Sequence, residues 1–172
     1  MRTPLLVLVL TLLAAAHCFA KVGGMRVEDM VRQSELIVLA KVESIEGAGG
    51  GKRYAQARVV EIWKGAQTET VEFLASPTWT CDISEAKKGE TVVLFLCKSD
   101  KSRSYQIFLS GRGRMPIRTV KGKTYATLWP EVGLPKDTPT IAGPEPKWDF
   151  IRSVEVSTLR DLVKSALPKK EQ

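Results

Sequence analysis

The sequence predicts a mainly β protein, a small barrel or sandwich with a short helix near each end of the mature chain. Five or six short apolar stretches with strand-like patterns follow one another at intervals of 8–15 residues, and glycine turns separate them. Apolar residues at helical spacing mark one segment before these stretches and one at the C-terminal end. The composition is ordinary for a folded domain, with 44% hydrophobic and 26% charged residues.

Residues 1–20 predict a secretory signal peptide. Arg2 precedes an apolar run that is too short to span a bilayer, and no later segment is a candidate membrane helix. Cleavage after Ala20 would remove Cys18, whereas cleavage after Ala16 would retain it. We favour the cut after Ala20, because the earlier one leaves almost no polar region before the cleavage site. The expected localisation is secreted or periplasmic, with no transmembrane segment.

The mature chain lacks the side chains on which common catalytic and metal sites are built. After the favoured cleavage it has no histidine and only two cysteines, Cys81 and Cys97. This excludes serine–histidine–aspartate and cysteine–histidine nucleophile systems, and zinc sites built on histidine and cysteine. No phosphate-binding glycine loop, nucleophile elbow or EF-hand spacing occurs. We therefore expect a protein that is not an enzyme, with no catalytic residue, metal or cofactor.

An amphipathic helix is expected over residues 25–34, and the strands follow it. Val27, Met30 and Val31 recur on one face of that helix. Strands are expected over residues 36–42, 53–63, 68–74, 91–97 and 104–109. The stretch 91–97 is apolar on both faces, so we expect it to be the central strand.

The chain changes in character after the last of these strands. Residues 117–128, interrupted at Lys121-Gly122, predict an extra hairpin, so the barrel domain is expected over residues 21–128. Five of the nine prolines lie between residues 130 and 146. They predict an irregular, extended connector over residues 129–156.

A second helix is expected over residues 157–167. Ser157 is the expected N-cap, and Pro168 ends the helix. The helix carries one apolar stripe, formed by Leu159, Leu162, Val163, Ala166 and Leu167. A single stripe on an otherwise charged helix predicts that it docks on the barrel.

Four segments in series resemble a known family. The first is a predicted strand, Ser34–Val42, and the second is a strand that ends in a Lys-Gly turn, Ala57–Gly65. The third is a strand followed by a loop that contains a cysteine, Val71–Cys81, and the fourth is an apolar strand that follows a glycine, Gly89–Leu96. In this order and spacing they resemble the N-terminal domain of tissue inhibitors of metalloproteinases and its bacterial relatives, within the netrin-like OB-fold group. The resemblance covers roughly residues 25–110. It implies a five-stranded OB-type Greek-key barrel, in agreement with the strand count.

The resemblance also implies a binding function. Family inhibitors chelate the protease zinc with the amine and carbonyl of an N-terminal cysteine, which a disulfide ties to the loop that corresponds to Cys81. Here the only candidate for that cysteine is Cys18, which lies in the favoured signal peptide, and the earlier cut would leave His17 before it. Inhibition of metalloendopeptidases through the N-terminus and the Trp79/Cys81 loop is therefore an alternative function.

The two cysteines of the mature chain predict a disulfide. In an exported protein Cys81 and Cys97 are expected to pair, which would stabilise the fold by about 3 kcal/mol for a loop of this size. The alternative pairs Cys81 with Cys18 and leaves Cys97 as a buried apolar residue of its strand.

Positive charge is concentrated between Lys98 and Lys123. Eight lysines and arginines stand there against one acid, Asp100, although the whole chain carries a net charge of only +7. The candidate binding residues of this window are Arg103, Arg112, Arg114 and Arg118. Two of them flank Gly113 in a glycine-containing loop, which suits forked contacts with carboxylate or phosphate; the alternative is an ordinary turn and a solvated surface.

Trp79, beside Cys81, lies in a second candidate binding loop over residues 75–82. In the resembling inhibitors this loop flanks the contact with the protease, and the alternative is an indole that covers the end of the barrel. We expect an exported, monomeric, non-catalytic binding module whose partner is a protein or an anionic envelope polymer. A second alternative, single-stranded nucleic acid, is disfavoured because an exported protein rarely meets it.

Overall fold

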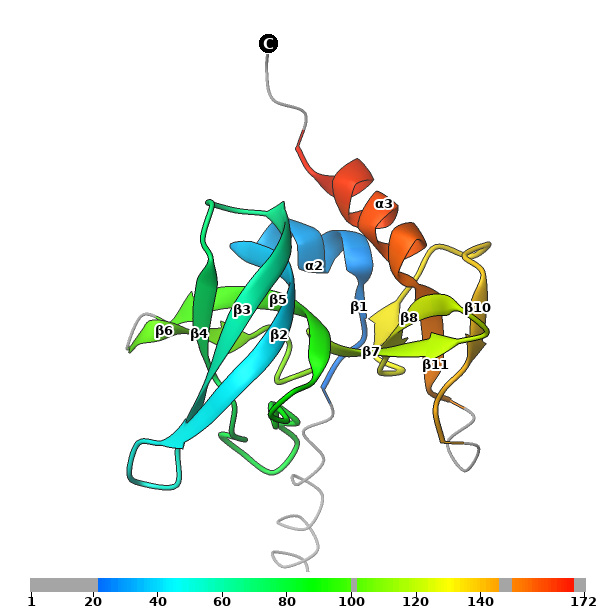
Figure 1. Ribbon diagram of the computed structural model, residues 1–172. Helices are drawn as coiled ribbons and strands as arrows, with labels where there is room; N and C mark the ends of the chain where they lie inside the picture. The colour runs from blue at the N-terminus through cyan, green and yellow to red at the C-terminus, as the bar shows by residue number, and fades with distance from the viewer. Residues whose placement is uncertain (1–21, 100–101, 146–149, 169–172) are drawn as a thin grey trace, which may run out of the picture.

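Five strands close into a barrel in the computed structural model, which describes residues 22–99, 102–145 and 150–168 (Figure 1). They are β2 (Leu36–Gly47), β3 (Arg53–Lys64), β4 (Thr70–Leu74), β5 (Thr91–Ser99) and β6 (Ser102–Ile107). The strands pair in the order β5-β2-β3-β4-β6, and β6 pairs with β5 to close the ring. Only β4 and β6 among these pairs run parallel. This is the OB-type barrel that the sequence predicted; the signal peptide and Cys18 lie outside the described residues.

The central strand is β5, as its two apolar faces predicted. It pairs with β2, with β6 and with β7 (Arg114–Val120). Val92, Leu94 and Leu96 belong to the buried cluster inside the barrel, whereas Val93 and Phe95 belong to a second cluster on the outer side. Because side chains alternate across a strand, one apolar run supplies both cores.

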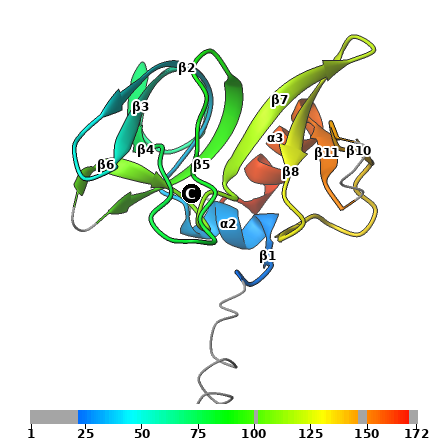
Figure 2. The ribbon, with the colours of Figure 1, turned by 90° about the horizontal axis from the view of Figure 1, so that it is seen from below.

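A second sheet continues from β5 through the predicted hairpin of β7 and β8 (Lys123–Leu128), so that barrel and sheet stand side by side (Figure 2). Lys121 and Gly122 connect the two strands with φ of 49° and 78°. Two successive residues with positive φ form the tight turn that matches strand twist.

The proline-rich connector is more regular than the sequence predicted. It contributes β9 (Val132–Gly133), β10 (Thr140–Ala142) and β11 (Arg152–Glu155). β9 pairs in parallel with β1 (Met25–Arg26), while β11 and β10 extend the second sheet beyond β8. The prolines lie between these strands, so they leave the ladders intact.

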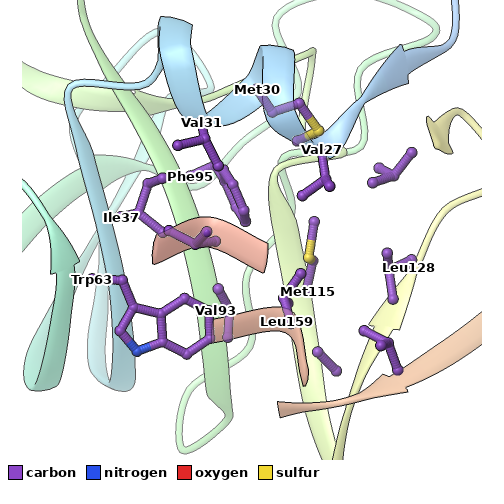
Figure 3. Packing of buried hydrophobic residues seen from close by; sticks show 14 of the residues in the cluster. Val27, Met30, Val31, Ile37, Trp63, Val93, Phe95, Met115, Leu128 and Leu159 are labelled. Carbon is purple, nitrogen blue, oxygen red and sulfur yellow. The ribbon is translucent and has the colours of Figure 1, made fainter. Parts of the chain in front are cut away.

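Two helices, α2 (Val27–Gln33) and α3 (Val156–Ala166), cover the second core (Figure 3). The buried residues that they contribute are Val27, Met30, Val31, Val156, Leu159 and Val163. α3 follows β11 without a loop and begins one residue earlier than predicted. Ser157 is not its N-cap; Glu155 holds that position, and Ser157 donates a hydrogen bond to its carboxylate.

The Lys-Gly turn after β3 attaches α2 to the barrel. Lys64 Nζ donates to the carbonyls of Val31 (2.6 Å) and Ser34 (2.5 Å), which lie at the C-terminal end of α2. Burial lowers the pKa of Lys64, although the carboxylate of Glu35 acts in the opposite direction. Gly65 has φ +102°, and a Cβ there would lie 2.7 Å from the Glu35 carbonyl oxygen. The turn therefore requires glycine.

Candidate functional site

Two loops converge over the outer side of the barrel beside β4, β5 and β6. One connects β4 to β5 and contains Trp79 and Cys81; the other connects β6 to β7. Between them lies a cavity of about 340 Å³, lined by residues that include Thr78, Asp82, Ser84, Cys97, Gln106 and Ser110.

Asp82 orders the loop that carries Trp79. Its carboxylate accepts hydrogen bonds from the backbone N–H and the hydroxyl of Thr78, both at 2.8 Å, and from the backbone N–H of Ser84 at 2.9 Å. The Ser84 hydroxyl donates a fourth. Burial alone would raise the pKa of Asp82, but the hydrogen bonds from Ser84 and Thr78 together hold that pKa below its usual value. The loop is thus held by an internal carboxylate, which is not free to act on a ligand.

Trp79 stands on the surface of this loop. The residue is 40% exposed and belongs to neither buried cluster of the described residues. Its Nε1–H donates to Ser110 Oγ at 3.3 Å. A large aromatic side chain that is both exposed and oriented by a hydrogen bond is typical of a contact surface.

The second loop has a strained backbone where it meets the first. Leu109 and Ser110 have φ of 53° and 49°, and Gly111 follows with φ of 88°. A Cβ on Gly111 would lie 2.4 Å from the carbonyl carbon of Ile83 and from the amide nitrogen of Ser84. Non-glycine residues with positive φ persist only where their surroundings impose them, and such residues cluster at ligand contacts.

Arg112 joins this region to the start of the described chain. The residue is 7% exposed, and its Nη1 donates to the carbonyls of Cys81 and Ser110. Its Nη2 lies 3.4 Å from Glu131 Oε1, and the Glu131 carbonyl accepts from Met25 N at 2.8 Å. The sequence did not predict a role for Glu131, because this residue lies in the connector, far from Arg112 in sequence and outside any recognisable motif.

Arg114 and Arg118 do not form one surface with Arg112. Arg114 is 9% exposed and makes a two-pronged ion pair with Glu90, in which Nε lies 2.8 Å from Oε1. Arg118 lies on the second sheet, and the side chain of Arg103 lies outside what the structure describes. The glycine-containing loop therefore does not present Arg112 and Arg114 to solvent. Arg114 makes a forked contact with a carboxylate inside the fold, whereas Arg112 divides its donors between two backbone carbonyls and one carboxylate oxygen.

The expected disulfide between Cys81 and Cys97 is absent, and both residues are free thiols. Cys97 Sγ–H lies against β6 and donates to the Gln106 carbonyl at 3.7 Å. Burial, followed by the nearby carboxylate of Glu35, raises the pKa of the Cys97 thiol. Arg112 holds the Cys81 carbonyl, and the loop around it is fixed by hydrogen bonds rather than by a covalent link.

Chemically, this arrangement offers a rigid contact surface. Within residues 22–99, 102–145 and 150–168, no group of three or more His, Cys, Asp or Glu side chains could hold a metal ion. No helix in the described part of the chain is long and apolar enough to cross a membrane. No protein-family model and no curated protein matches this chain.

Proposed function

We propose that this protein is an exported, non-catalytic module that binds another protein through a surface we call the Trp79 ridge. The ridge comprises residues 78–81 and the N-terminal segment 22–24, which Arg112 and Glu131 connect. The observation that carries the proposal is Trp79 itself, an exposed indole on a loop that internal hydrogen bonds hold rigid. A rigid aromatic anchor loses little conformational entropy on binding and gains a large contact area.

A protein is a better partner for this ridge than an anionic polymer. Arg112 and Arg114, the two arginines of the adjacent glycine-containing loop, are buried and paired with Glu131 and Glu90. A polymer of negative charge is held mainly by exposed cations. Because these cations are already used inside the fold, binding at the ridge would depend on shape and apolar contact.

The netrin-like resemblance supports the same surface. In the resembling inhibitors the N-terminal residue and the loop that corresponds to Cys81 together contact the protease. In this chain the Arg112 guanidinium reaches both the Cys81 carbonyl and the Glu131 carboxylate, and Glu131 in turn accepts from Met25 N. This contact favours inhibition of a metalloendopeptidase as the second candidate function.

A photo-crosslinking residue at position 79, expressed in the exported full chain, tests the ridge. We expect one discrete protein adduct from position 79 and none from position 150, where Phe150 is similarly exposed at 43%. Once that partner is purified, Trp79→Ala should weaken its binding at least 30-fold, from the 2 kcal/mol or more typical of an aromatic anchor. Phe150→Ala should leave the affinity unchanged. Equal adducts from both positions, or equal losses in both variants, would refute the ridge.

The inhibitor function has its own test. The mass of the mature N-terminus establishes which residue comes first, and the same material is assayed against purified zinc metalloendopeptidases. Inhibition that disappears on adding one residue before the natural N-terminus supports zinc chelation. If Trp79→Ala abolishes binding to a protein partner but the parent protein inhibits no protease, the binding function is supported and the inhibitor function is refuted.

A further inference from the structure

A cavity of about 550 Å³ lies on the second sheet, away from the Trp79 ridge. Side chains of β7 and β8 alternate across that sheet: Ile117 and Ala126 pack with the second core, while Arg118 and Tyr125, which pair across the two strands, line the cavity. Both views place this sheet on the opposite side of β5 from β6 (Figures 1 and 2). The cavity shares no lining residue with the one between the two loops.

The cavity carries positive charge that no carboxylate of the described residues neutralises. Arg118 is oriented by two uncharged acceptors, Ser153 Oγ at 3.2 Å and the Ala142 carbonyl. Lys121, in the turn of the hairpin, also lines the cavity. Among the ion pairs of the described residues, neither Arg118 nor Lys121 has a carboxylate partner, whereas Lys123 pairs with Glu155 at 3.0 Å. A fixed guanidinium beside a free ammonium group is an arrangement suited to an anionic group.

Lys123 also lines the cavity, but Glu155 neutralises its charge, and the rest of the lining is apolar or aromatic. Val120, Ile141 and the half-buried Tyr125 form the wall beside the cations. The volume lies in the range of small-ligand sites and greatly exceeds that of a single phosphate or sulfate ion. An aromatic ring beside cationic donors suits a ligand ring that has an apolar C–H face and bears a negative substituent.

We propose that this cavity binds an anionic saccharide, with its sulfate or carboxylate group at Arg118 and Lys121 and its sugar ring against Tyr125. Single-stranded nucleic acid fits less well, because it is usually held by several stacked aromatic residues along an extended basic groove. This site is independent of the Trp79 ridge and would give an exported binding module a second contact, with a charged glycan.

Calorimetric titration of the full mature chain tests the site with two probes. A heparin-derived hexasaccharide offers sulfate and carboxylate groups, and a hexagalacturonate offers carboxylates alone. Lys121→Asn removes one cation and keeps the turn, because asparagine tolerates positive φ. Lys52→Asn is the matched control, since Lys52 is also an exposed lysine beside a glycine in a hairpin turn, between β2 and β3.

We expect at least one probe to bind. Lys121→Asn should weaken it about two- to fivefold at low salt and reduce the dependence of log affinity on log salt by about one. Tyr125→Leu should weaken binding about two- to tenfold without changing that slope. Lys52→Asn and Trp79→Ala should leave the affinity unchanged, the latter because the ridge is a separate surface.

Four results would overturn the proposal. The first is that neither probe binds. The second is that Lys52→Asn weakens binding as much as Lys121→Asn, which would mean a response to net charge alone. The third is that Tyr125→Leu has no effect and tripolyphosphate competes as well as either saccharide, which would reduce the cavity to an ion site. Loss of binding with Trp79→Ala alone would move the saccharide to the ridge and equally refute this location.

Discussion

Replacing Glu90 with Gln should destabilise the junction between the barrel and the second sheet. β5 and β7 meet over three residue pairs, from Val92 with Pro116 to Leu94 with Arg114. At this junction the side chains of Arg114 and Glu90 are each only 11% exposed and form a two-pronged ion pair. Glu90→Gln keeps the shape and one acceptor but leaves the Arg114 charge without a counter-charge.

The structure sets the size of the expected loss. Removing one partner from a buried ion pair costs about 3–5 kcal/mol, because the remaining charge is neither hydrated nor paired. For a chain of this length that loss corresponds to a decrease in melting temperature of about 6–20 °C. The exposed pair of Arg58 and Glu43, whose side chains are 55% and 51% exposed, is the control. Glu43→Gln should cost about 1 kcal/mol or less.

Urea unfolding followed by tryptophan fluorescence and by circular dichroism measures both variants. A cycle with Arg114→Met and the double variant isolates the coupling between the two residues. We expect the double variant to lose much less stability than the two single losses together, since it leaves no unpaired charge. An additive double variant, or a Glu90→Gln loss no greater than that of Glu43→Gln, would show that the pair does not stabilise the junction.

Three further predictions concern the loops and the Lys-Gly turn. Asp82→Asn should cost about 1–3 kcal/mol at neutral pH in urea unfolding. Folding lowers the pKa of Asp82, so the carboxylate contributes fully to the free energy of unfolding above its unfolded pKa of about 4. That contribution is lost as the pH falls through the folded-state pKa. Only the parent protein, and not Asp82→Asn, should therefore show this loss of stability in acid. Gly111→Ala should lower the melting temperature more than Gly122→Ala, because both have positive φ but only the former Cβ would meet backbone atoms; equal losses would argue against the loop contact. Lys64→Met should cost about 1–2 kcal/mol and increase hydrogen exchange in α2, whose terminal carbonyls would lose their donor; unchanged exchange would contradict that role.

Local patterns were sufficient to predict the elements of the barrel. The patterns used were alternation with period two, glycine turns and helical spacing. Each is a property of residues that are close in sequence, so it can be recognised without knowledge of the fold. The stretch 91–97 shows this best, since its two apolar faces correctly predicted the strand that serves two cores. The stretch 117–128, interrupted at Lys121-Gly122, likewise predicted the hairpin of β7 and β8.

The same reasoning failed where a residue's role depends on a distant partner. Arg112 and Arg114 looked like surface groups because their sequence neighbours are glycines and other cations, but their partners Glu131 and Glu90 come from other segments. The connector looked irregular because of its prolines, while its short strands form only where other strands are already in position. A cluster of charge along the chain is therefore not a cluster in space.

By itself, the sequence determined the β class, the order of the main strands and the two helices, because these follow from side-chain periodicity and turn chemistry. Tertiary structure alone decided which cations are neutralised, which thiols stay apart and which aromatic residues remain exposed. Each of those outcomes depends on distances between segments that are remote in the chain, and burial makes an unpaired charge far more costly than an exposed one. Among the described residues, Arg118 donates to uncharged acceptors, and neither Arg118 nor Lys121 has a carboxylate partner.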